Sequence, residues 1–149
     1  MRAVVQRVTR ARVAVDGQTV GQTGPGLLVY AAAAPDDTDA DIAYVADKVT
    51  HLRIFPDEEG KMNRSVLDIA GGVLLVSAFT VQADARKGRR PSFDASAPGE
   101  VAAPLIERLI AALRGHGLPV ETGRFAAHMQ VESVNDGPIC ILLDSRRAF

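Results

Sequence analysis

Apolar residues in the first third of the chain fall in short runs separated by turn signals, a pattern typical of β-strands. Valines recur between positions 4 and 15, and Asp16-Gly17 predicts a hairpin between residues 12–15 and 18–21. After a turn at residues 24–26, the continuous apolar run 27–31 predicts a strand buried on both faces. Further strands are predicted at residues 73–79, 129–134 and 139–143.

Two segments repeat apolar residues at helical spacing. The first begins at Thr38 and Asp41, which resemble a capping box. The second runs from about residue 99 to 114, where Pro104 is tolerable because it falls in the first turn. The apolar faces consist of Ile42, Val45, Val49 and Leu52 in the first helix, and of Val101, Leu105, Leu109 and Leu113 in the second.

No repeat or linker interrupts the chain, so we expect one domain over residues 1–149. Many strands and only two helices predict a layered domain in which the helices cover one side of the sheets. No apolar stretch is long enough to span a bilayer, and the first residues do not resemble a signal peptide. Cys140 is the only cysteine, which excludes an internal disulfide. We therefore expect a cytoplasmic protein with no membrane partner.

Two short segments far apart in the chain are the strongest candidates for a site. Ser77-Ala78-Phe79-Thr80 follows a buried strand, and Asn135-Asp136-Gly137-Pro138 forms a tight turn before another apolar run. Neither segment contains a strong nucleophile or a set of metal ligands, which favours a site built from backbone and shape. The two hydroxyls could equally cap a turn. No Gly-x-Ser-x-Gly elbow supports a catalytic triad.

The remaining chemistry-bearing residues favour structural roles. The chain has no metal-ligand spacing, no Walker loop and no dinucleotide fingerprint, so neither a metal nor a cofactor is expected. His128 is expected in a strand, with a structural role. Cys140 is expected to be a buried, inert thiol inside an apolar strand.

A dense basic run follows the buried strand at residues 73–79. Two interpretations are open. The run is either a solvated part of an ordered surface loop over residues 84–99, or a loop beside a site that contacts phosphates. The net charge of −1 argues against a protein that coats nucleic acid generally, but not against a local basic patch. The basic residues are Arg86, Lys87, Arg89 and Arg90.

Together these segments resemble the D-aminoacyl-tRNA deacylase family, long called D-tyrosyl-tRNA deacylases. The resemblance covers nearly the whole chain and is collinear, which makes it highly specific. It is carried by residues 1–8, 52–55, 60–63, 86–93, 129–132 and 134–138.

The resemblance implies an α/β, barrel-like layered domain with two main helices on one side. It implies a homodimer that hydrolyses the ester of D-aminoacyl-tRNA, rejects L-aminoacyl-tRNA, and needs no DNA partner. Glycyl-tRNA is also an expected substrate, because glycine has no side chain to clash. The implied catalytic residues are Ser77, Phe79 and Thr80.

The family's second signature falls on Gly137-Pro138. By resemblance this peptide bond is cis and enters the active site of the partner subunit, where its backbone excludes L-amino acids. Arg7 is implied to hold this motif. Phe125 and Met129 match residues near the adenosine and amino-acid pocket, and the basic run is the expected contact to tRNA.

Two positions depart from the family pattern. Ala78 replaces a glutamine, which removes a polar side chain, and Cys140 replaces a threonine, which weakens hydrogen bonding. Ala78 favours one alternative function, a non-catalytic protein that binds the acceptor end of tRNA. A relative that acts on mischarged L-alanyl-tRNA is a further alternative, against which Phe79 counts.

Overall fold

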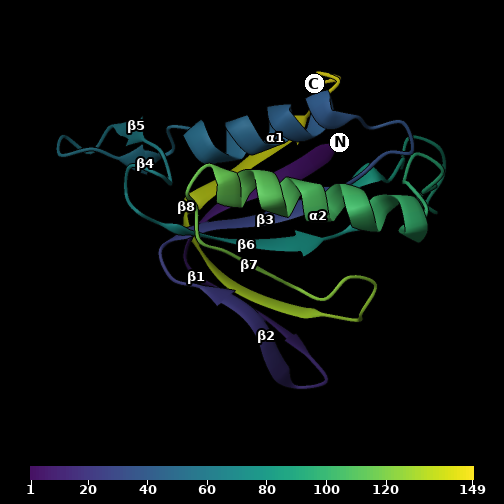
Figure 1. The fold of residues 1–149 in the computed structure, drawn as a ribbon, viewed down its shortest axis with the longest axis horizontal. Coiled ribbons are helices and arrows are strands. Elements are labelled where there is room, and N and C mark those ends of the chain that lie inside the picture. The colour runs from purple at the N-terminus through teal and green to yellow at the C-terminus, as the bar shows by residue number, and fades with distance from the viewer.

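One long strand, β1 (Arg2–Val15), organises the sheet of this computed structural model, which describes residues 1–149. Its first half pairs with β3 (Gly26–Ala32) and its second half with β2 (Gln18–Thr23). The other edge of β1 pairs along almost its whole length with β8 (Gln130–Asp144). Because one strand serves two partners in succession, the sheet curls and becomes barrel-like (Figure 1).

The curl is nearly closed where β2 approaches β7 (Val120–Thr122). A Cβ atom on Gly21 of β2 would lie 2.3 Å from the backbone oxygen of Thr122. Real side chains do not tolerate such a distance, so this contact requires glycine. The Asp16-Gly17 hairpin has positive φ at both turn residues, as predicted for a type I′ turn.

The centre of the sheet is parallel. β3, β6 (Gly72–Ser77) and β7 run in the same direction, and Tyr30 of β3 pairs with Val76 of β6. Side chains alternate between the faces of a strand, so Val29 and Leu75 face the helices while Leu28 and Leu74 fill the inside of the curl. The prediction that β3 is buried on both faces is confirmed.

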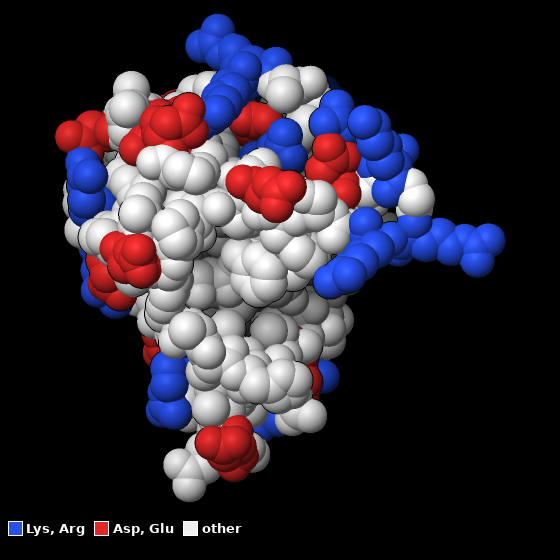
Figure 2. Space-filling view, turned by 90° about the vertical axis from the view of Figure 1, so that its right-hand side faces the viewer, with Lys and Arg blue, Asp and Glu red and all other residues white.

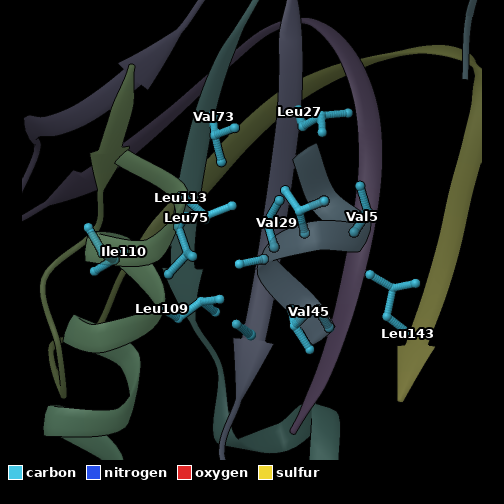
Figure 3. Packing of buried hydrophobic residues seen from close by; sticks show 14 of the residues in the cluster. Val5, Leu27, Val29, Val45, Val73, Leu75, Leu109, Ile110, Leu113 and Leu143 are labelled. Atoms are coloured by element: carbon cyan, nitrogen blue, oxygen red, sulfur yellow. The ribbon is translucent and has the colours of Figure 1, made fainter. Parts of the chain in front are cut away.

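Two helices, α1 (Asp39–His51) and α2 (Gly99–Gly115), cover one face of the sheet (Figure 1). The capping box predicted at Thr38 and Asp41 is present at the start of α1. Figure 3 shows Val45 and Leu109 pointing toward the sheet side chains of the same core. Leu109 is completely buried, which contributes about 1.5–3 kcal/mol.

The C-terminal region differs from the sequence-based expectation. β8 is one strand and not two, because residues 135–138 form a bulge within it, with register shifts near Val8. Asn135 stabilises the bulge: its side-chain oxygen accepts from the Ile139 N–H at 2.7 Å, and its amide donates to the Ile139 carbonyl at 2.8 Å. The Gly137–Pro138 peptide bond is cis.

Three local expectations are wrong. Residues 73–79 do not form one strand, because β6 ends at Ser77 and Phe79 begins the short 3₁₀ helix η1 (Phe79–Gln82). His128 lies in the irregular segment before β8 and not in a strand. Cys140 is exposed and not buried, because its strand position faces away from the core beside Gln6.

A small hairpin of β4 (Phe55–Pro56) and β5 (Met62–Arg64) projects from the end of the sheet opposite the tips of β3 and β6 (Figure 1). No helix is both long enough and apolar enough to cross a membrane.

A buried polar cluster joins the two ends of the chain. The Asp37 carboxylate accepts from the N-terminal ammonium of Met1 at 2.6 Å and from the Ala34 N–H at 2.7 Å, and the side chains of Met1 and Asp37 are fully buried. Ser145 bridges the ammonium and Asp41. Burial raises the pKa of Asp41, but the hydrogen bonds from Ser145 and Thr38 outweigh this effect and lower the pKa to about 2.

Replacing Asp37 by alanine is expected to destabilise the fold by about 3–5 kcal/mol, because a buried ammonium loses its partner. Urea-induced unfolding measures this loss. Asp36→Ala is the matched control, since Asp36 is an exposed neighbour paired only with Arg146, and a much smaller loss is expected there. Equal losses in the two variants would contradict the role of the buried pair.

Candidate active site

A pocket of about 630 Å³ opens where the parallel strands β3 and β6 end. The carboxyl ends of parallel strands are a common place for ligand sites, because loops diverge there. Small side chains leave the space open, namely Ala31–Ala33 at the end of β3, Ala97 before α2 and Ala102 in α2. Fifteen of the nineteen lining residues are hydrophobic, so the few polar groups in the pocket decide what it can bind.

The segment after β6 forms one wall of the pocket. The Ala78 N–H donates to the Ala31 carbonyl at 2.9 Å and so continues the ladder between β3 and β6 for one residue. The chain then turns into η1, and buried Gln82 fixes this turn through a 3.3 Å hydrogen bond to the Ala32 carbonyl. The N–H groups of Phe79 and Thr80 have no acceptor within the protein and are free to donate to a ligand.

The hydroxyls of Ser77 and Thr80 line the pocket without capping η1 through a side-chain hydrogen bond. The interpretation of this segment as a capped turn is therefore wrong. His128 lines the same pocket, but no hydrogen bond joins it to either hydroxyl. The arrangement provides backbone donors and hydroxyls but no activated nucleophile–base pair.

Phe125 and Met129, both expected at the site, line the pocket from the segment between β7 and β8. A Cβ atom on Gly123 would lie 2.5 Å from the Met129 sulfur, so glycine lets this segment pack closely. A Cβ atom on Gly99 would lie 3.8 Å from the Phe125 ring, which places this ring beside the start of α2.

The basic loop, residues 84–94, is attached to the pocket wall. Phe93 packs edge-on against Phe79 with ring centroids 5.1 Å apart, and the Ser96 hydroxyl donates to the Phe79 carbonyl at 2.8 Å. In Figure 2, which views the end of the sheet where the pocket opens, the centre is hollowed and uncharged, and Lys and Arg gather above it and to its right.

The four basic residues are not equivalent. Arg86 forms a two-pronged pair with Asp84, whose pKa is held well below its usual range by this contact. Asp84 also bridges to Ser92 through the backbone, so Arg86 helps to close the loop. Lys87, Arg89 and Arg90 are exposed and form no ion pair.

Gly137 and Pro138 do not line the pocket of their own chain and are exposed. Arg7 lies beside them: its guanidinium donates to the Asp136 carbonyl at 2.8 Å and to the Ile54 carbonyl at 2.5 Å. The structure therefore brings Ser77, Ala78, Phe79, Thr80, Phe125 and Met129 together, and it leaves Arg7, Gly137 and Pro138 at a separate surface.

Sequence reasoning missed two residues that line the pocket, Tyr30 and His128, and one that supports its wall, Gln82. Tyr30 is the only aromatic residue of β3, and its position next to Val76 follows from strand pairing alone. Gln82 offered one signal, a polar residue directly after the strand-end motif. His128 precedes Met129 and lies in an irregular segment, where the sequence pattern indicates a strand.

The fold and pocket define an α/β domain with an apolar pocket at the carboxyl ends of parallel strands. The chain belongs to the D-Tyr-tRNA(Tyr) deacylase family, whose family model matches residues 4–144. It is 56% identical to a D-aminoacyl-tRNA deacylase of Heliobacterium modesticaldum over 98% of this chain and 97% of that one. A D-aminoacyl-tRNA deacylase of Kineococcus radiotolerans is 58% identical, over 97% of this chain and 100% of the relative.

A solved structure has the same fold throughout. The c-Myc DNA Unwinding Element Binding Protein superposes with a TM-score of 0.92 and 38% identity, over 97% of this chain and 98% of the other.

Proposed function

We propose that this protein hydrolyses the ester bond of D-aminoacyl-tRNA to give a free D-amino acid and tRNA. Its family and its relatives' names support this activity. The observation that carries the mechanism is the pair of free N–H groups at Phe79 and Thr80 in an apolar pocket without a nucleophile–base pair. An aminoacyl ester is already activated, so donors that stabilise charge are sufficient.

In the proposed reaction, water attacks the ester carbonyl carbon, and the carbonyl oxygen becomes an oxyanion. The two free N–H groups donate to this oxyanion, and each such donor typically contributes about 3–4 kcal/mol to transition-state stabilisation. The bond to the ribose 3′-oxygen then breaks, and that oxygen leaves with a proton. The neighbouring 2′-hydroxyl of the substrate assists the attack. Thr80 as a covalent nucleophile ranks second, because no base contacts it.

The proposed selection against L-amino acids needs a second copy of the chain. Gly137 and Pro138 are exposed and lie outside their own pocket, so only a partner's copy can reach the substrate. In a homodimer, the backbone of this segment screens the α-carbon of the bound amino acid. A filter at the α-carbon does not depend on the side chain beyond it, so D-esters are accepted broadly and glycyl-tRNA is cleaved too.

The proposed tRNA contact is the basic loop, and we place the protein in the cytoplasm with charged tRNA. Lys87, Arg89 and Arg90 carry unpaired charges next to the pocket, a suitable position for backbone phosphates. Arg86 is already paired with Asp84 and acts mainly to shape the loop.

The alternative function is binding without catalysis. Ala78 lines the pocket where the family has a polar side chain, so a protein that binds the acceptor end without turnover is the competing proposal. The name of one solved relative attributes binding of a DNA element to that protein, so DNA belongs among the competitors in binding experiments.

The purified protein is expected to deacylate D-tyrosyl-tRNA and glycyl-tRNA and to leave L-tyrosyl-tRNA intact. Thr80→Ala is expected to retain activity within about tenfold, because the chemistry lies on backbone donors and substrate. Loss of a covalent nucleophile typically reduces kcat by about a million-fold. Acid-gel or thin-layer analysis of the tRNA measures both results. Binding of charged tRNA without turnover of any ester would favour the non-catalytic alternative.

Replacing Lys87, Arg89 and Arg90 together by glutamine is expected to raise KM for charged tRNA and to leave kcat nearly unchanged. The slope of log KM against log salt concentration should decrease by up to about 0.7–0.9 for each phosphate that the variant no longer neutralises. Arg86→Gln is the matched control and should change this slope least. D-tyrosyl-adenosine, which lacks the tRNA body, should be hydrolysed equally by all variants, and slower hydrolysis of this small ester would contradict a phosphate-binding role.

Arg7→Gln is expected to loosen residues 135–138 and to increase the hydrolysis of L-tyrosyl-tRNA relative to the D-ester. Arg10→Gln is the control, because Arg10 is an exposed arginine of the same strand and forms no ion pair. Sedimentation velocity establishes whether each variant has twice the mass of the 15.8 kDa chain. Unchanged discrimination in an intact Arg7→Gln dimer would contradict the proposed filter.

A further inference from the structure

The hydroxyl of Tyr30 is a polar group in the pocket that the mechanism does not use. Tyr30 is half-buried on β3, and its ring packs with the cluster inside the curled sheet. Its hydroxyl makes no hydrogen bond within the protein. Every side-chain oxygen or nitrogen that is buried in the structure has a hydrogen-bond partner, so an unpaired hydroxyl cannot be a buried one. The hydroxyl is therefore accessible, and the pocket that Tyr30 lines is where a ligand can meet it.

The pocket has two sides, which lie on opposite faces of the strand ends. One side is lined by Ala102 and Ile106 of α2 and by Ala97 just before this helix. Tyr30 and Val131 belong to the other side, which ends in the apolar interior of the curl. That interior is filled by buried side chains such as Leu28 and Leu74, so this side is closed.

A closed compartment fits a ligand part of constant size. Amino-acid side chains differ in size among aminoacyl-tRNAs, whereas every tRNA ends in adenosine. Met129 and Val131 line the same pocket and pack against the same cluster as Tyr30, and they offer apolar contact to the face of a flat base. Burial raises the pKa of Tyr30 above its ordinary value, so the group is a neutral hydroxyl at physiological pH and can both donate and accept.

We infer that Tyr30 recognises the 3′-terminal adenine through a hydrogen bond between its hydroxyl and the edge of the base. The inference rests on the proposed function and adds a specificity-determining residue to it. The ring of Tyr30 forms part of the wall, and the hydroxyl selects a base whose edge can pair with it. A site built to pair with a polar edge discriminates against ligands that lack this edge.

The test combines one variant with a series of nucleosides. Tyr30→Phe removes only the hydroxyl and is expected to weaken adenosine binding, measured by calorimetry, by about three- to tenfold. Tyr44→Phe is the matched control, because Tyr44 is the only other tyrosine and lies on α1 outside the pocket. Its binding should equal that of the wild type.

The series identifies the contacted atom. Purine riboside lacks the 6-amino group, and 1-deaza-, 3-deaza- and 7-deazaadenosine each lack one ring nitrogen. For the analogue that lacks the contacted atom, the wild type and Tyr30→Phe should bind equally. If Tyr30→Phe binds adenosine as tightly as the wild type, the inference is overturned. It is also overturned if Tyr30→Phe binds every analogue more weakly than the wild type by the same factor.

Hydrolysis of D-tyrosyl-adenosine separates this inference from the proposed function. If the wild type hydrolyses this ester and Tyr30→Phe has the same kcat/KM, the role of Tyr30 is overturned and the proposed function stands. Absence of turnover, together with adenosine binding that depends on the Tyr30 hydroxyl, overturns the enzyme and supports base recognition. A three- to tenfold rise in KM with unchanged kcat supports both.

Discussion

The parallel pairing of β3 and β6 is the constraint on which the site depends. Parallel strands end at the same edge of a sheet, so the chain must leave β3 and β6 side by side. The ladder continues for one residue, through the Ala78 N–H, and then stops. The next two N–H groups, of Phe79 and Thr80, are left without partners at the rim of the pocket. Unpaired donors of this kind are a cost in folding that a site can use in catalysis.

Much of the fold was predictable because its signals are local. The Asp16-Gly17 hairpin, the capping box at Thr38 and the double burial of β3 each depend on neighbouring residues, and each is found. The failures involve tertiary context. The bulge at residues 135–138 stays within one strand because β1 pairs on both sides of it. Cys140 is exposed because the apolar run around it has only one covered face.

The site was predictable in part for the same reason. The strand-end motif was found because it follows an apolar run, and Phe125 and Met129 came from resemblance to a family. Tyr30 could not be found in this way. It lies within an apolar strand and is remote in sequence from the motif, and only the pairing of β3 with β6 brings it to the pocket. The structure was also needed to show that Arg86 is the basic residue already paired, because nothing in the sequence distinguishes Asp84 from other acidic residues.

The contacts of Phe79 with the basic loop have a thermodynamic consequence. Phe93 and Ser96 connect this loop to the residue whose N–H borders the pocket. Under the proposed function, free energy from phosphates that reposition this loop is shared with the pocket, and linkage requires the effect to be reciprocal. In that proposal, the body of a tRNA alters the affinity for its own terminal ester, so that an intact tRNA binds differently from the sum of its two proposed contact regions.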